Sequence, residues 1–296
     1  MPQEIEIDGM TRTDVTREAI TGVAAGVPYM ALPPTGDREG APLVAVWHLM
    51  DPPRTEAAMA AALPLAGVPA WRVYFGLPML GARSPAGGFE EVMRLMADDL
   101  ALKVLGPMID QAAAEAPAAM HALRGELGIG DGPIGLVGAS AGSAVALRLL
   151  AEASLPVTAA ALVSPVVQLA PVVEYYGGPS HGWTARARAL AERLDFVARA
   201  SEIAGRDPQP ALLMVSGARD HAAFREAPAA LRDALTRVYA DPERVKVVSV
   251  PEMAHALAEA PGTEPAPQTK DAERVDAVVT EWLRRHLEAP LQEGER

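Results

Sequence analysis

Residues 134–143, with the sequence IGLVGASAGS, restrict most strongly how this 296-residue chain can fold. An apolar run at 134–137 leads into Gly138-Ala139-Ser140-Ala141-Gly142, and residues that favour a helix follow at once, up to Glu152. This order predicts a strand, a tight turn and a helix. Because the turn holds only glycine, alanine and serine, the backbones of the strand and the helix can approach each other closely.

The turn also fits the pattern G-x-S-x-G. By itself this pattern is equally consistent with a glycine-rich turn in an alanine-rich protein. Between a strand and a helix it has a mechanism, because the strained turn presents the serine hydroxyl as a nucleophile. The other motifs and the predicted strands of the chain are needed to distinguish these two interpretations.

Composition excludes several classes of function. With 26 basic and 38 acidic side chains the net charge is -12, which opposes binding to nucleic acid or to an anionic membrane. The absence of cysteine excludes disulfides, zinc-thiolate sites and a cysteine nucleophile. Residues 1–20 are interspersed with charges, unlike a signal peptide, and the chain has no apolar run of membrane-spanning length. We expect a cytoplasmic monomer or homodimer.

Strand-like and helical segments alternate along the chain. A hairpin is expected at 19–32, and buried strands at 42–49, 70–75, 134–137, 157–163, 211–216 and 245–250. Helices are expected at 55–65, 89–103, 107–127, 141–152, 222–240 and 272–287. The alternation predicts an α/β fold with a mostly parallel sheet and helices on both faces. We expect one domain over 1–296, with 168–210 inserted as a small helical cap.

Two polar residues follow later strands of the predicted sheet. Asp220 comes shortly after the strand 211–216, and His255 shortly after the strand 245–250. Parallel α/β sheets bind ligands beyond the carboxyl ends of their strands, so both side chains are expected to lie near Ser140. The order Ser, Asp, His along the chain is the order found in α/β-hydrolases.

On these residues the sequence resembles the α/β-hydrolase superfamily, in particular its smaller esterase-like, dienelactone-hydrolase-like and prolyl-oligopeptidase-like members. The motifs that carry the resemblance are GASAG at 138–142, SGARD at 216–220 and MAH at 253–255, and it extends over about 19–287. It implies a serine hydrolase without metal or cofactor, in which Ser140 is the nucleophile, Asp220 the acid and His255 the base.

The chemistry explains why each residue type is needed. A serine hydroxyl is a weak nucleophile until a base such as His255 removes its proton. The Asp220 carboxylate would hold the other ring nitrogen and fix the tautomer. The oxyanion needs backbone donors, which we expect to be the N–H groups of Ala141 and Met50, with Leu49 as the alternative to Met50. The family usually has His-Gly before the second donor. This chain has His48-Leu49 instead, so its oxyanion hole departs from the family's pattern.

Further side chains are candidates for contact with substrate, and each also has a plainer interpretation. They are His48, Leu49, Ser164, Tyr175, Tyr176, His181 and Trp183. His48 is better suited to shaping its loop than to ionising, the aromatic residues could simply pack within the cap, and His181 could face solvent. Asp241 precedes a proline and resembles a turn former, so Asp220 remains the expected carboxylate.

The expected function is hydrolysis of a small or medium uncharged carboxylic ester through an acyl-enzyme on Ser140. Peptidase, thioesterase and lactonase reactions use the same residues and remain alternatives. A non-catalytic ligand-binding protein with this fold is a further alternative. It is disfavoured because a binding protein does not need all three of Ser140, Asp220 and His255.

Overall fold

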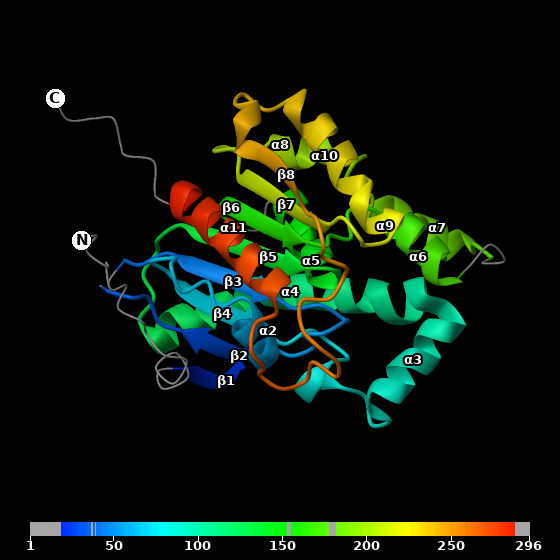
Figure 1. Cartoon of the computed structure of the whole chain (residues 1–296), viewed down its shortest axis with the longest axis horizontal. Coiled ribbons are helices and arrows are strands. Elements are labelled where there is room, and N and C mark those ends of the chain that lie inside the picture. Colours follow the sequence, from blue (N-terminus) through cyan, green and yellow to red (C-terminus); the bar gives the residue numbers. More distant parts are fainter. Residues whose placement is uncertain (1–18, 37, 39, 153–154, 178–181, 288–296) are drawn as a thin grey trace, which may run out of the picture.

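The computed structural model describes residues 19–36, 38, 40–152, 155–177 and 182–287. Within these ranges the strands form one eight-stranded sheet in the order β1-β2-β4-β3-β5-β6-β7-β8 (Figure 1). The pairs β1–β2 and β2–β4 are antiparallel, and every pair from β4 to β8 is parallel. The strands are β1 (Ile20–Ala24), β2 (Val27–Leu32), β3 (Leu43–Trp47), β4 (Trp71–Phe75), β5 (Ile134–Ala139), β6 (Val157–Val163), β7 (Ala211–Gly217) and β8 (Val245–Val250).

Helices cover both faces of this sheet. α2 (Glu56–Ala62) and α11 (Lys270–His286) pack on one face, and α4 (Gly106–Leu127), α5 (Ala141–Ala151) and α10 (Ala227–Thr236) on the other. The remaining helices are α3 (Gly88–Asp99), α6 (Leu169–Gly177), α7 (Ala185–Arg193), α8 (Ala200–Ala204), α9 (Ala222–Arg225) and the short turns η1 (Gly81–Arg83), η2 (Leu100–Leu105) and η3 (Pro242–Arg244). None of the helices in the described ranges is long and apolar enough to cross a membrane. The predicted α/β fold with a mostly parallel sheet is confirmed.

The N-terminal hairpin has the turn that its sequence predicts. Ala25 and Gly26 connect β1 to β2 with φ values of +47° and +86°. Two positive φ angles in a two-residue loop match the right-handed twist of antiparallel strands. The hairpin therefore ends the sheet with an antiparallel edge.

Two predicted helices are interrupted. The helix expected at 89–103 stops at Asp99, whose φ of -159° leaves the helical region and whose carboxylate caps the Leu102 N–H at 2.8 Å. A π-helical segment, η2, then leads directly into α4. The helix expected at 222–240 breaks at Glu226 into α9 and α10, and Pro228 occupies the first turn of α10. Local side-chain capping and proline geometry thus override the helical pattern.

The order of the strands fixes where a ligand can bind. The strand after β3 in the chain, β4, pairs with one edge of β3. The next strand, β5, pairs with the opposite edge of β3, so the direction in which strands are added reverses here. In open α/β sheets such a reversal leaves a crevice beyond the carboxyl ends of the strands. The loops after β3 and β5 meet at this crevice.

Candidate active site

Ser140 occupies the turn between β5 and α5 with φ +49° and ψ -118°. Its N–H donates to the Val163 carbonyl at 2.9 Å, and its own carbonyl accepts from the Ser143 N–H at 2.9 Å. A positive φ is strained for a residue with a side chain, and such strain persists only where the surroundings enforce it. The strained turn expected at Ser140 is therefore observed, together with the contacts that hold it.

The two glycines of the turn have no room for a side chain. A Cβ atom on Gly138 would lie 2.3 Å from the Gly142 carbonyl oxygen, and one on Gly142 would lie 2.6 Å from the Trp47 carbonyl oxygen. Both contacts are with backbone, which cannot rotate away as a side chain can. Glycine is required here because the end of β5, the start of α5 and the end of β3 pack against one another.

Ser140, His255 and Asp220 lie in hydrogen-bond contact. His255 Nε2 is 2.8 Å from Ser140 Oγ, and His255 Nδ1 is 2.8 Å from Asp220 Oδ2. The other Asp220 oxygen accepts from the His221 N–H at 2.7 Å, and the Asp220 side chain is only 2% exposed. The loops after β5, β7 and β8 bring the three side chains together, as the strand-end positions predict.

The segment that carries His255 is held from several sides. The Ser164 hydroxyl donates to the His255 carbonyl at 3.3 Å, and the Phe224 ring lies 4.2 Å from the imidazole between centroids. A Cβ on Gly217 would lie 2.2 Å from the Met253 carbonyl oxygen, so the end of β7 packs directly on this segment. These contacts restrict the imidazole to the position between Ser140 and Asp220.

Two backbone N–H groups beside Ser140 are available for a ligand. Ala141 is the first residue of α5, so its N–H has no acceptor within the helix. The Met50 N–H makes no hydrogen bond within the described residues. The Leu49 side chain is buried in the core of the α2 and α11 face, away from the cavity described below. Ala141 and Met50 remain the proposed oxyanion donors, with the Leu49 N–H as the alternative to Met50.

His48 stabilises the loop that carries Met50. It is buried, its Nδ1–H donates to the Leu49 carbonyl at 2.8 Å, and its Nε2 accepts from the Leu77 N–H at 3.1 Å. Burial lowers the pKa of His48 to about 4. The neutral imidazole therefore joins the loop after β3 to the loop after β4, and it does not line the cavity.

Replacing His48 by glutamine is expected to make stability less dependent on pH. Folding lowers the pKa of His48 from 6.5 to about 4, so between these values the unfolded chain binds a proton that the folded chain does not. The stability that neutral His48 contributes is thus complete above about pH 6.5 and is lost as pH falls toward about 4. Denaturant unfolding at pH 7.5 and pH 5 should show the wild type losing about 2 kcal/mol more than His48→Gln. Equal losses would show that His48 is not buried in its neutral form.

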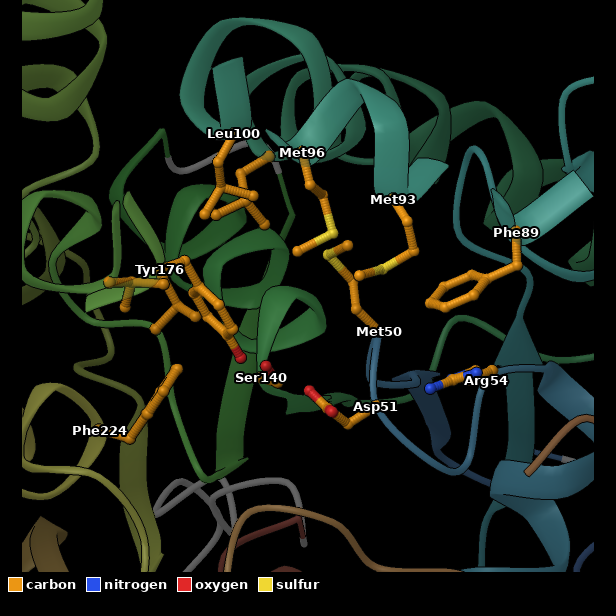
Figure 2. A pocket seen from close by; sticks show the side chains of 13 residues that line it. Met50, Asp51, Arg54, Phe89, Met93, Met96, Leu100, Ser140, Tyr176 and Phe224 are labelled. Carbon is orange, nitrogen blue, oxygen red and sulfur yellow. The ribbon is translucent and has the colours of Figure 1, made fainter. Parts of the chain in front are cut away.

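A cavity of about 210 Å³ opens beside Ser140 (Figure 2). Most of its lining comes from apolar side chains on α3, on η2 and on the loops after β3 and β6. The lining residues are Met50, Asp51, Arg54, Phe89, Met93, Met96, Leu100, Leu105, Ser140, Val166, Val172, Tyr176 and Phe224. Segment 88–105 supplies five of these residues, whereas the expected cap at 168–210 supplies only Val172 and Tyr176. Segment 88–105 thus supplies more of the cavity lining than the expected cap does. A helix was expected at 89–103, but the sequence did not connect it with the site.

Among the seven expected substrate contacts, Tyr176 lines this cavity. Burial, and secondarily the nearby Asp51 carboxylate, raises the pKa of the Tyr176 phenol, so it is protonated near neutral pH. Tyr175 instead stacks on His221 with centroids 3.6 Å apart, and the Trp183 indole N–H donates to Glu174 at 3.3 Å. Tyr175 and Trp183 do not line the cavity, nor do His48, Leu49 and Ser164. His181 lies outside the described residues.

Sequence reasoning missed two charged residues of the cavity, Asp51 and Arg54. Asp51 Oδ2 lies 3.8 Å from His255 Nε2. Both residues follow β3 in the sequence HLMDPPRT, and their position after a central strand was the available signal. No cluster of residues suited to binding a metal ion occurs in the described ranges.

No protein-family profile and no curated protein matches this sequence. Among solved structures, the chain is similar to the protein TT1662 from Thermus thermophilus, at 20% identity over 92% of this chain and 98% of that chain, with a TM-score of 0.61. It is similar to the esterase Pf2001 from Pyrococcus furiosus, at 13% identity over 97% and 99%, with a TM-score of 0.59. It is also similar to the acylaminoacyl peptidase of Pyrococcus horikoshii, at 14% identity over 94% and 42%, with a TM-score of 0.57.

The sheet topology and these neighbours agree. The chain has the α/β-hydrolase fold. At these identities the likeness establishes the fold, and the reaction has to be argued from the site.

Proposed function

We propose that this protein is a serine hydrolase that cleaves carboxylic esters. The observation that carries the proposal is the unbroken hydrogen-bonded series Ser140 Oγ, His255 and Asp220, with 2.8 Å at both contacts. A nucleophile, a base and a group that orients the base are the parts that acyl transfer requires. A purely ligand-binding protein has no need for this arrangement at a strained turn.

Each step follows from the geometry. Ser140 Oγ attacks the ester carbonyl carbon while its proton passes to His255 Nε2, and the carbonyl electron pair moves onto the oxygen. We assign the Ala141 and Met50 N–H groups as the donors to this oxyanion. The C–O bond to the alcohol then breaks, and the alcohol leaves with the proton from His255. Water, deprotonated by His255, then attacks the acyl carbon. The bond between the acyl carbon and Ser140 Oγ breaks, the carboxylic acid leaves, and His255 returns the proton to Oγ.

The cavity limits the size of the group that can lie beside Ser140. A volume of about 210 Å³ equals the share of roughly seven water molecules in the liquid. This favours a small or medium acyl chain over a long fatty chain. Apolar side chains, five of them methionine or phenylalanine, form most of the wall, which suits carbon chains.

Thioesters, lactones and short peptides remain alternative substrates, because the same residues would act on each of them. An ester is favoured because the cavity suits a short carbon chain. A series of p-nitrophenyl esters of increasing acyl length, assayed beside aminoacyl p-nitroanilides, tests the choice. We expect hydrolysis of the shorter esters, with rates falling once the chain exceeds the cavity. Cleavage of anilides at rates matching the esters would instead favour a peptidase.

A further inference from the structure

Arg54 lies in the loop after β3, at the opposite end of the cavity from Ser140 (Figure 2). Its backbone N–H donates to the Gly262 carbonyl at 2.7 Å. Its guanidinium carbon lies 4.1 Å from the centroid of the Phe89 ring on α3. The loop and the aromatic ring therefore fix the position of the guanidinium at the cavity wall.

Within the part of the chain that the structure describes, the guanidinium has no anionic partner. Its Nε atom is buried and makes no hydrogen bond, and within the described residues Arg54 forms no ion pair. By contrast, Arg83 pairs with Glu115 at 2.8 Å. A guanidinium carries five N–H donors, and a buried donor without an acceptor destabilises the protein. An unpaired Arg54 in a mostly apolar cavity is therefore a site for an acceptor that the substrate supplies.

Asp51 is the acidic side chain among the lining residues, and it lies on the Ser140 side of Arg54 (Figure 2). It approaches His255 Nε2 at 3.8 Å and forms no ion pair with Arg54 within the described residues. Because like charges repel, Asp51 would keep an anionic group away from the reacting carbonyl. An anion in this cavity is therefore directed to the end where Arg54 and Phe89 lie.

We propose that Arg54 binds a carboxylate of the substrate, so that the protein prefers esters whose acyl chain ends in a carboxylate. The inference rests on the proposed function of Ser140, and it replaces the uncharged acyl chain expected from sequence. A carboxylate matches the planar fork of one guanidinium in charge and in spacing. The Phe89 ring lies 4.1 Å from the guanidinium carbon and offers no oxygen acceptor to the N–H groups, so they still need one.

The test compares esters that differ only at the end of the acyl chain. Monoethyl succinate, glutarate and adipate are assayed beside ethyl butyrate, valerate and hexanoate, with released ethanol as the common readout. We expect kcat/KM of the wild type to favour at least one carboxylate ester over its uncharged counterpart by about tenfold or more. Arg54→Gln should remove this preference while retaining hydrolysis of the uncharged esters. Arg54→Lys should restore part of it, because lysine keeps the charge but not the fork.

Arg94→Gln is the matched control. Arg94 lies on α3, the helix that carries Phe89, but is mainly exposed and pairs with Glu91 at 2.6 Å. It should leave the preference unchanged. If the wild type hydrolyses both series without preference, or if Arg54→Gln lowers both equally, Arg54 only shapes the cavity and the inference is wrong.

A binding measurement separates this inference from the proposed function. Glutarate should raise the melting temperature of the wild type and of Ser140→Ala, but not that of Arg54→Gln, while glutaramide, which has the same length but no charge, should raise none of them. Stabilisation by glutarate without hydrolysis of any ester would contradict the esterase proposal and support the carboxylate site. Hydrolysis of uncharged esters without stabilisation by glutarate would support the esterase and overturn the carboxylate site.

Discussion

Replacing Ser140 by alanine is expected to lower kcat for ester hydrolysis by about 10⁴ to 10⁶-fold. The Ser140 hydroxyl lies 2.8 Å from His255 Nε2, and among the described residues no other serine lines the cavity. Initial rates on a short p-nitrophenyl ester measure the effect, and circular dichroism checks that the variant is folded. A loss of less than tenfold would mean that another group performs the attack.

Asp220→Asn should lower kcat by about 10⁴-fold, because an amide at this position stabilises the wrong imidazole tautomer. Asp241→Asn is its matched control. The Asp241 carboxylate caps the Glu243 N–H at 3.0 Å in the short turn before β8, as its position before a proline predicts. This variant should keep wild-type kcat. Equal losses in both variants would indicate a general loss of structure instead of a loss of orientation at His255.

Replacing Gly138 by alanine is expected to destabilise the fold by about 3 kcal/mol or more. The added Cβ would lie 2.3 Å from the Gly142 carbonyl oxygen and 2.6 Å from the Ser143 Cα, so β5 and α5 would have to separate. Denaturant unfolding gives the free energy of unfolding. The expected result is a much lower midpoint, or no soluble protein.

Gly125→Ala is the control for the glycine effect. Gly125 lies in α4, and a Cβ there would meet nothing within 4 Å. Because alanine favours a helix more than glycine does, this variant should be more stable by up to about 1 kcal/mol. If Gly138→Ala retains wild-type stability, the close packing at the turn is not what requires glycine there.

The arrangement of the strands could be predicted because local patterns determine it. The two apolar stretches around Gly26 form the hairpin, and the continuous apolar runs form the parallel strands that helices cover on both faces. The GASAG turn could be located because close packing of the backbones leaves no room for a side chain at Gly138 and Gly142, and glycine at these positions is visible in the sequence. The positions of Asp220 and His255 followed from a general property of parallel sheets, in which loops at the carboxyl ends converge.

The walls of the cavity could not be predicted in the same way. The helical pattern at 89–103 indicates an apolar face but does not say what that face covers, and in the structure Met93 and Met96 cover Ser140. Tyr175 and Trp183 were considered for the wall because they are aromatic, yet Tyr175 pairs with His221 in the structure. Which side chain faces a cavity depends on contacts between distant segments.

The charged side chains that line the cavity could not be predicted from the sequence either. Asp51 and Arg54 are three residues apart in segment 48–55, which contains no helix or strand. No periodicity in the sequence therefore predicts which way their side chains point. Arg54 is placed by Phe89 and by the Gly262 carbonyl, which is more than 200 residues away in the chain. Sequence reasoning therefore identified the residues proposed for catalysis but not the two charged residues that line the cavity.

Covalent labelling with a fluorophosphonate ester tests the central claim most directly. If His255 activates Ser140, the wild type should form one adduct, located at Ser140 by mass spectrometry of its peptides, because unactivated hydroxyls react very slowly. His255→Ala should suppress the adduct strongly, whereas His121→Ala, which changes a surface histidine on α4, should leave it unchanged. Wild-type protein that forms no adduct, or labelling of Ser140 that survives His255→Ala, would contradict the account.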